Sequence, residues 1–186
     1  VGGITLDPEL QTSSRMFAFV FRMFAEGDAA LPAAGMGALP AQLAAGLPET
    51  AILHNARVTS VQDGRVTVEN GGSFAARAVV VATDGPEAAA LLGEVEPPAS
   101  RSVMCLYYTT HEAPLDEPIL VLNGDGTGPV NNLAVLTNVA PSYAPPGIAL
   151  VSVSVLGNPL RSDAQIEADV RAQLTEWFGE AVARWD

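Results

Sequence analysis

The side chains that most often perform chemistry are few in this chain, and their spacing forms no catalytic pattern. The two histidines, His54 and His111, stand far apart and match no metal-ligand spacing such as His-x-x-x-His. The single cysteine, Cys105, lies in an apolar run, so we interpret it as a core residue rather than a nucleophile. One cysteine also excludes a Cys-based zinc site and an internal disulfide framework. These residues predict no nucleophile, general base or metal centre.

Two glycine-containing segments are candidates for ligand-binding loops. Gly35, Met36 and Gly37 precede a short apolar helix, and glycine there allows a ligand to approach the backbone closely. An ordinary turn explains the same residues equally well. The segment from Gly124 to Gly128 lacks the Lys-Ser/Thr of a phosphate-binding P-loop, and no amphipathic helix follows it. We therefore interpret it as a hairpin loop between strands.

A central segment, residues 52–92, is expected to position any ligand site. A half-alternating strand around Val58 is followed by Asp63-Gly64, a strong hairpin signal, and by an alternating strand from Arg65 to Val68. The run from Ala78 to Ala82 does not alternate, which is typical of a strand buried on both faces of a parallel sheet.

Helices are predicted on both sides of this segment. Asp84 is placed to cap a helix that runs to Leu92, and Pro86 suits its first turn. Residues 1–10 look extended or irregular, and a helix follows from Ser14 to Glu26. That helix is apolar almost all round, so we expect it to be buried in a core or to line an apolar cavity. A short helix is expected around Leu39 to Leu47.

The remainder of the chain predicts a mainly antiparallel sheet covered by one helix. Val151, Val153 and Val155 alternate with serines, the pattern of a half-buried strand. A capping box opens a helix from Ser162 to Phe178, whose apolar face is expected to cover the sheet. The strands are predicted at Ser102–Thr110, Ile119–Leu122, Leu133–Asn138 and Ile148–Leu156.

Composition indicates a globular protein. The chain has 186 residues, of which 48% are hydrophobic and 16% charged, and its formal net charge is −12. An acidic chain of this kind is a poor partner for nucleic acid or an anionic membrane, and no apolar run approaches the ~20 residues that span a bilayer. A cytoplasmic location fits these properties.

The segment from Phe17 to Leu92 resembles the superfamily of flavin-containing amine oxidases, phytoene desaturases and protoporphyrinogen oxidases. The resemblance rests on the Leu31–Ala44 segment with its Gly-Met-Gly and Leu-Pro, and on the order of strand, hairpin, Ala78-Val79-Val80-Val81-Ala82-Thr83 and helix. An unrelated α/β domain with a hairpin is the alternative.

The resemblance implies an α+β fold with three parts. Residues 1–49 would supply helices of the substrate-binding domain, 50–94 a strand-hairpin-strand piece of the FAD-binding domain, and 95–186 the mixed, mainly antiparallel substrate-domain sheet and its covering helix. The best candidate boundary is Glu94 to Pro98. No Gly-x-Gly-x-x-Gly fingerprint occurs, so we expect an internal fragment of a larger FAD-dependent oxidoreductase that binds no FAD and is inactive alone.

The resemblance also implies roles for individual residues. Val58 would contact the adenine of FAD through its backbone, Ala82 and Thr83 would lie near the dinucleotide, and the Gly35-Met36-Gly37 loop would approach the substrate. The lysine usual in such active sites cannot be assigned, because the sequence contains no lysine.

The expected partners are a small apolar substrate and the rest of the flavin domain. A hydride would pass from substrate to flavin only in the complete enzyme. The competing hypotheses are a stand-alone α+β module that binds an apolar small molecule and a purely structural interaction domain.

Overall fold

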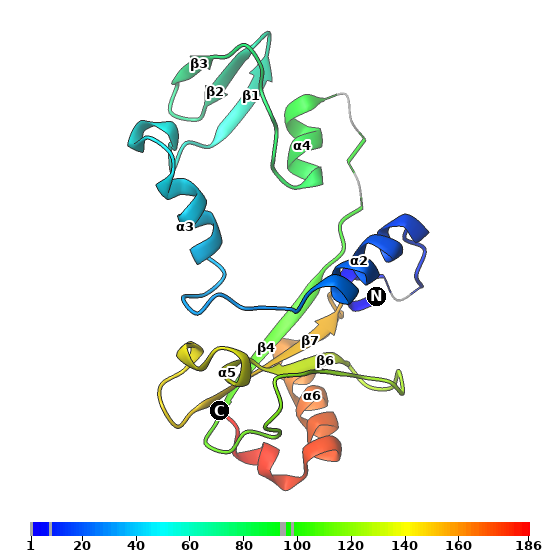
Figure 1. The fold of residues 1–186 in the computed structure, drawn as a ribbon. Coiled ribbons are helices and arrows are strands. Elements are labelled where there is room, and N and C mark those ends of the chain that lie inside the picture. Colours follow the sequence, from blue (N-terminus) through cyan, green and yellow to red (C-terminus); the bar gives the residue numbers. More distant parts are fainter. Residues whose placement is uncertain (1, 8, 94–95, 98) are drawn as a thin grey trace. The chain divides into compact units, whose positions relative to one another are not determined.

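A computed structural model describes residues 2–7, 9–93, 96–97 and 99–186 (Figure 1). The chain divides into two compact units, residues 1–40 together with 101–186, and residues 41–100. Each unit holds one antiparallel sheet with helices, which confirms the predicted α+β class. Glu94, Val95 and Pro98 of the predicted boundary lie outside the described residues, and the three-part division stays a prediction.

The smaller unit is organised by a β-hairpin. Strand β1 (Val58–Gln62) pairs antiparallel with β2 (Arg65–Val68), which pairs in turn with β3 (Ser73–Ala75). Asp63 and Gly64 have φ angles of 50° and 70°, the left-handed pair of a two-residue hairpin turn. A 3-10 turn, η1 (Glu49–Ala51), precedes this sheet. The hairpin prediction is confirmed.

The prediction of a buried strand from Ala78 to Ala82 is wrong in this structure. These residues form no strand, and the Val80 side chain is 88% exposed. A strand forms only where at least one neighbouring strand pairs with it, and no strand of the described residues pairs with this run. Helix α4 (Gly85–Leu92) follows as predicted, with the Asp84 carboxylate accepting a hydrogen bond from the Glu87 N–H at 3.0 Å.

The larger unit contains a four-stranded antiparallel sheet in the order β4-β7-β6-β5. The strands are β4 (Val103–Thr110), β5 (Leu120–Leu122), β6 (Val130–Val135) and β7 (Ala149–Leu156). The prediction for residues 133–138 is correct only in its first half. The strand begins earlier, at Val130, and the chain turns into the short helix α5 (Leu136–Val139), followed by η2 (Pro141–Tyr143).

Helix α6 (Asp163–Phe178) covers one face of this sheet (Figure 1). Its capping box joins Ser162 and Gln165, and Gly179 ends it, both as predicted. The core combines the inward residues of β7 with the predicted apolar face of the helix, and a 3-10 turn, η3 (Glu180–Arg184), follows. The fully buried side chains include Val151, Val153, Val170 and Leu174.

Alternation along β4 corrects the interpretation of Cys105. Met104, Leu106 and Tyr108 pack on the core, so the residues between them face the other side of the sheet. Cys105 is therefore exposed, whereas its apolar neighbours in the sequence predicted a place in the core.

The N-terminal helices differ from expectation in burial more than in position. Helix α1 (Gly2–Thr5) occupies part of a segment predicted to be irregular, and α2 (Ser14–Glu26) and α3 (Ala38–Ala45) lie where they were predicted. Helix α2, however, buries only Val20, and Phe21 is 64% exposed. The predicted burial of α2 is wrong here, because the described residues leave most of its apolar side chains uncovered. No described helix combines the length and apolarity needed to cross a membrane.

Candidate functional site

The hairpin of the smaller unit presents a free strand edge at Val58. Strand β1 lies at one edge of its sheet, and Val58 is the register partner of Val68 on β2. The Arg57 carbonyl accepts a hydrogen bond from the Glu69 N–H at 2.9 Å, so it points toward β2. Adjacent strand residues direct their N–H and C=O groups to opposite edges. The backbone groups of Val58 therefore point away from β2, to the side where no described strand pairs.

Ala82 and Thr83 lie in the same unit as Val58, directly before α4. Both residues are exposed, and the Thr83 hydroxyl donates a hydrogen bond to the Asp84 carbonyl at 3.2 Å. The Arg57 guanidinium and the Glu87 carboxylate lie 3.7 Å apart, which links the start of β1 to α4. Both side chains of this ion pair are exposed, so it contributes little to stability.

The start of α4 has the wrong charge for a phosphate group. Asp84 caps the helix with its carboxylate, and Glu87 occupies the first turn. Both carboxylates interact favourably with the helix dipole, and the Asp84 carboxylate occupies the Glu87 N–H that an anion would use. This helix terminus is therefore unfavourable for a pyrophosphate.

Gly35, Met36 and Gly37 lie in the larger unit, in a turn before α3. Gly35 has a φ of 85°, a conformation that favours glycine, and its N–H donates to the Pro32 carbonyl at 2.9 Å. Met36 is 58% exposed. The turn is thus a defined structure that presents an apolar side chain to solvent.

Two residues that were not predicted as site residues anchor this turn. The Tyr143 hydroxyl donates a hydrogen bond to the Pro32 carbonyl at 3.0 Å, and the Ser142 hydroxyl donates to the Ala33 carbonyl. Both donors come from η2, more than a hundred positions along the chain. No local signal connects these segments, so only the tertiary structure reveals the contact.

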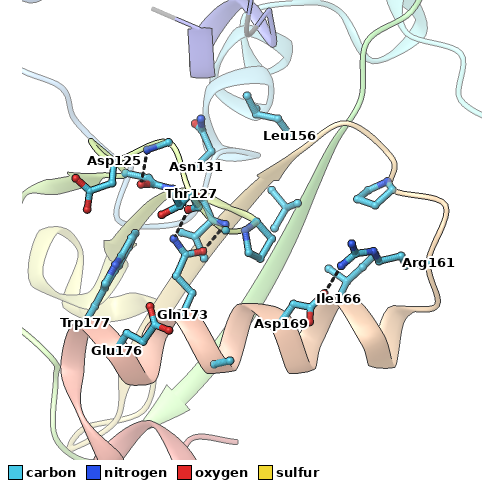
Figure 2. A pocket seen from close by; sticks show the side chains of 18 residues that line it. Asp125, Thr127, Asn131, Leu156, Arg161, Ile166, Asp169, Gln173, Glu176 and Trp177 are labelled. Carbon is cyan, nitrogen blue, oxygen red and sulfur yellow. Dashed lines mark hydrogen bonds and ion pairs between the residues drawn. The ribbon is translucent and has the colours of Figure 1, made fainter.

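A cavity of about 1070 Å³ lies between the β5–β6 loop and α6 (Figure 2). Asp125 and Trp177 lie at one end of the view, and the ion pair of Arg161 with Asp169 lies at the other. None of the predicted site residues lines it. The loop is the predicted glycine-rich hairpin, and its backbone is held in place from α6.

Gln173 of α6 forms the hydrogen bonds that fix the β5–β6 loop. Its side-chain oxygen accepts from the Val130 N–H at 2.9 Å, and its side-chain nitrogen donates to the Thr127 carbonyl at 2.8 Å. A Cβ atom at Gly128, where φ is 74°, would clash with the Gln173 amide. Gln173 is the one polar residue among the buried residues of α6, and that pattern could have identified it from sequence.

The buried end of β4 carries a strongly perturbed phenol. Tyr108 is 3% exposed, and its hydroxyl has no hydrogen-bond partner among the described residues. Burial, with a smaller contribution from the nearby Glu167 carboxylate, raises the pKa of Tyr108 to about 12, although the Arg171 guanidinium acts in the opposite direction. The Arg171 guanidinium lies 5.1 Å from the centre of the Tyr108 ring. A phenol in this state remains protonated and does not serve as a base.

A buried carboxylate ties the N-terminal segment to the start of β4. Asp7 accepts hydrogen bonds from the N–H and the hydroxyl of Thr12, both at 3.0 Å, and its carboxylate lies 3.1 Å from the Arg101 guanidinium. Burial alone raises the pKa of Asp7, but the contacts with Thr12 and Arg101 together outweigh it and lower that pKa. The ion pair is structural, because each group already has its partner.

Within the described part of the chain, no group of three or more His, Cys, Asp or Glu residues is arranged to hold a metal ion. The family model described as flavin containing amine oxidoreductase matches residues 1–186. A comparison with curated proteins finds no match.

Proposed function

Because this chain belongs to the flavin-containing amine oxidoreductase family, we propose that it forms part of an FAD-dependent oxidoreductase. In that enzyme it contributes part of the flavin site and the wall of the substrate site. The chemistry that FAD supplies in such enzymes is acceptance of a hydride from the substrate. In this proposal the residues of the chain bind and orient the cofactor and the substrate.

The observation that carries the flavin assignment is the free edge at Val58. An N–H and a C=O that point away from β2 offer one donor and one acceptor, the pair that the edge of an adenine ring requires. The residues present therefore fit the adenine of FAD at this edge. The Val58 side chain is half-buried, which suits a packing role beside the backbone contact.

Ala82 and Thr83 are proposed to contact the cofactor away from its phosphates. The acidic start of α4 disfavours a pyrophosphate, whereas the exposed backbone of these residues and the Thr83 hydroxyl suit an uncharged part of the dinucleotide. The pyrophosphate would then depend on a glycine-rich fingerprint outside this sequence.

Gly35, Met36 and Gly37 are proposed to contact the substrate. The support is the anchored turn, which presents the Met36 side chain from a fixed backbone. A thioether side chain adapts to apolar ligands of irregular shape.

A stand-alone module that binds an apolar molecule is the second candidate. A cavity of about 270 Å³ between Leu10 and Phe17 favours it, together with the stacked rings of Phe17 and Phe21, whose centroids lie 5.8 Å apart. Under this alternative, the chain would bind an apolar ligand. A longer polypeptide that contains the chain would then bind no flavin.

Flavin content separates the two candidates. The longest polypeptide that contains this chain should be purified and its visible absorbance recorded. A flavin spectrum that persists through gel filtration is expected. A folded, colourless polypeptide that takes up no added FAD would refute the oxidoreductase proposal and leave the binding module.

A further inference from the structure

The cavity between the β5–β6 loop and α6 has one wall that is already ordered (Figure 2). Gln173 fixes the loop from α6 through its hydrogen bonds to Val130 and Thr127. Within the loop, the Asn123 side-chain nitrogen donates to the carbonyls of the same two residues, both at 2.7 Å. The Asn123 side-chain oxygen accepts from the Gly126 N–H at 3.2 Å. Because this wall is ordered in advance, a ligand that binds there loses little affinity to the ordering of the loop.

Carboxylates outnumber guanidinium groups among the residues that line this cavity. The charged side chains of the lining are Asp125, Asp169, Glu176 and Arg161. Arg161 forms an ion pair with Asp169, whereas Asp125 and Glu176 form no ion pair with any described residue. Figure 2 shows Asp125 and Glu176 at the end of the cavity away from that ion pair. This end therefore carries two uncompensated negative charges, which attract a cation and repel an anion.

An aromatic ring lies at the same end of the cavity. Trp177 follows Glu176 on α6, and its half-buried ring lines the cavity (Figure 2). The Phe178 ring packs edge-on against it, with the two centroids 6.3 Å apart. The face of an indole attracts cations, and a guanidinium group stacks on such a face while its N–H groups donate to carboxylates. An indole with two carboxylates is therefore a suitable environment for a guanidinium group.

The rest of the lining favours an organic cation over a metal ion. Within the described part of the chain, no three His, Cys, Asp or Glu residues are arranged to hold a metal. Pro129 and Pro159 also line the cavity and add apolar surface. The cavity volume of about 1070 Å³ is that of a site for a small molecule rather than for a single ion. A ligand with a cationic head and an apolar body matches these surroundings.

We infer that this cavity binds a small organic cation of the guanidinium class. The cationic head lies among Asp125, Glu176 and Trp177, and the apolar body extends along Pro129 and Pro159. None of the residues predicted to contact the cofactor or the substrate lines the cavity, so the inference goes beyond the proposed function and does not depend on it.

Two probes of nearly the same shape test the charge preference. Benzylguanidinium is a cation, and its neutral isostere benzylurea has an oxygen in place of one nitrogen group. Each probe is titrated into the 186-residue chain by isothermal titration calorimetry. We expect saturable binding of benzylguanidinium, at least about tenfold tighter than that of benzylurea, because only the cation pairs with the two carboxylates. Equal or tighter binding of benzylurea, or no saturable binding of benzylguanidinium, would overturn the inference.

A matched pair of double substitutions locates the binding site. Asp125→Asn with Glu176→Gln removes both uncompensated charges and should weaken the binding of benzylguanidinium about tenfold or more. Asp116→Asn with Glu117→Gln removes the same charges from exposed residues outside the cavity lining, and should change the affinity less than about threefold. Equal weakening by both pairs would show that the net charge of the chain attracts the cation, and would contradict the inference. Circular dichroism verifies folding; if the 186-residue chain does not fold alone, the same titrations in the longer polypeptide decide.

Trp177 reports whether the cation enters the cavity. The chain has two tryptophans, Trp177 in the cavity lining and Trp185, which is 5% exposed in the core. Saturating benzylguanidinium should change the tryptophan emission of the unmodified chain, and Trp177→Phe should abolish most of that change. Constant emission during saturable binding would place the cation elsewhere and refute the assignment. Flavin content of the longer polypeptide is a separate measurement, so failure of this inference and failure of the oxidoreductase proposal remain distinct.

Discussion

Gln173 on α6 holds the backbone of Val130 on β6, with its side-chain oxygen 2.9 Å from the Val130 N–H. The contact joins residues 43 positions apart in sequence and is buried. It fixes the glycine-rich β5–β6 loop against the helix, and so shapes one wall of the cavity in Figure 2.

Gln173→Leu should destabilise the protein by about 1–3 kcal/mol. The substitution leaves the Val130 N–H buried without an acceptor and removes the hydrogen bond to the Thr127 carbonyl. Urea unfolding followed by circular dichroism measures the change. Glu176→Leu, on the same helix but exposed, is the control and should shift the free energy of unfolding by less than about 0.5 kcal/mol. Equal effects of both variants would mean that the Gln173 contact does not hold the loop.

Leu174→Ala should cost about 2–5 kcal/mol of unfolding free energy. The Leu174 side chain is fully buried between α6 and the sheet, so its truncation removes apolar contacts and leaves a cavity. Leu43→Ala, at a position 77% exposed on α3, is the matched control and should be close to neutral. A cost near zero for Leu174→Ala in chemical denaturation would contradict the packing of α6 on the sheet.

Val58→Pro should remove flavin from the longer polypeptide while leaving the hairpin folded. Proline lacks an N–H, and the N–H of Val58 points to the free edge of β1, so no hydrogen bond to β2 is lost. Val58→Ala keeps the backbone groups and should keep flavin, at a modest cost of about 0.8 kcal/mol per buried carbon removed. Flavin absorbance per polypeptide is the measurement.

Val68→Pro controls for the effect of proline on the hairpin itself. Val68 lies on the central strand, and its N–H donates to the Gly72 carbonyl at 2.9 Å, so this variant should lose sheet structure. A folded Val58→Pro protein with full flavin occupancy would assign Val58 as an ordinary strand residue.

Asp7 should make stability depend on pH in the acidic range. Its folded pKa lies below the ordinary value of 3.8, so the carboxylate stabilises the fold fully above that pH. The stabilisation is lost as the pH falls below 3.8 and through the lower folded pKa. Asp7→Asn should flatten this part of the pH profile of thermal unfolding. Thr12→Val removes one donor to Asp7 and should flatten it partly; a profile identical in all three proteins would refute the assignment.

Tyr108 should ionise only in strongly alkaline solution. Ultraviolet titration of tyrosinate in the unmodified protein and in Tyr108→Phe gives a difference curve, whose midpoint should lie near the folded pKa of about 12. The pKa of Tyr108 is raised above its ordinary value of 10. The contribution of its protonation to the free energy of unfolding is therefore complete below pH 10 and declines as the pH rises toward 12. Tyr108→Phe should be neutral or stabilising near pH 7, since the buried hydroxyl has no partner among the described residues. A difference curve centred near 10 would contradict its burial.

Local sequence signals predicted most of the secondary structure. The Asp63-Gly64 turn, the Asp84 cap and the capping box at Ser162 each act within a few residues of chain, so their chemistry is complete in the sequence. The alternation in β7 likewise predicted which valines enter the core, because successive side chains of a strand point to opposite faces.

Burial was predicted less well, because it depends on what lies opposite a segment. The run from Ala78 to Ala82 and helix α2 have the composition of buried elements, yet both are largely exposed in this structure. The predicted core position of Cys105 was wrong for the same reason, because apolar neighbours in the sequence do not determine which face of β4 a side chain lies on.

The sequence alone determined the α+β class, the positions of most helices and strands, and the resemblance that family membership confirmed. Only the tertiary structure decided that Gln173 holds Val130 and that Tyr143 anchors the turn that contains Gly35. The physical reason is distance along the chain. Caps and turns arise from neighbouring residues, whereas these contacts join segments that meet only after the sheet has selected its strand order and register.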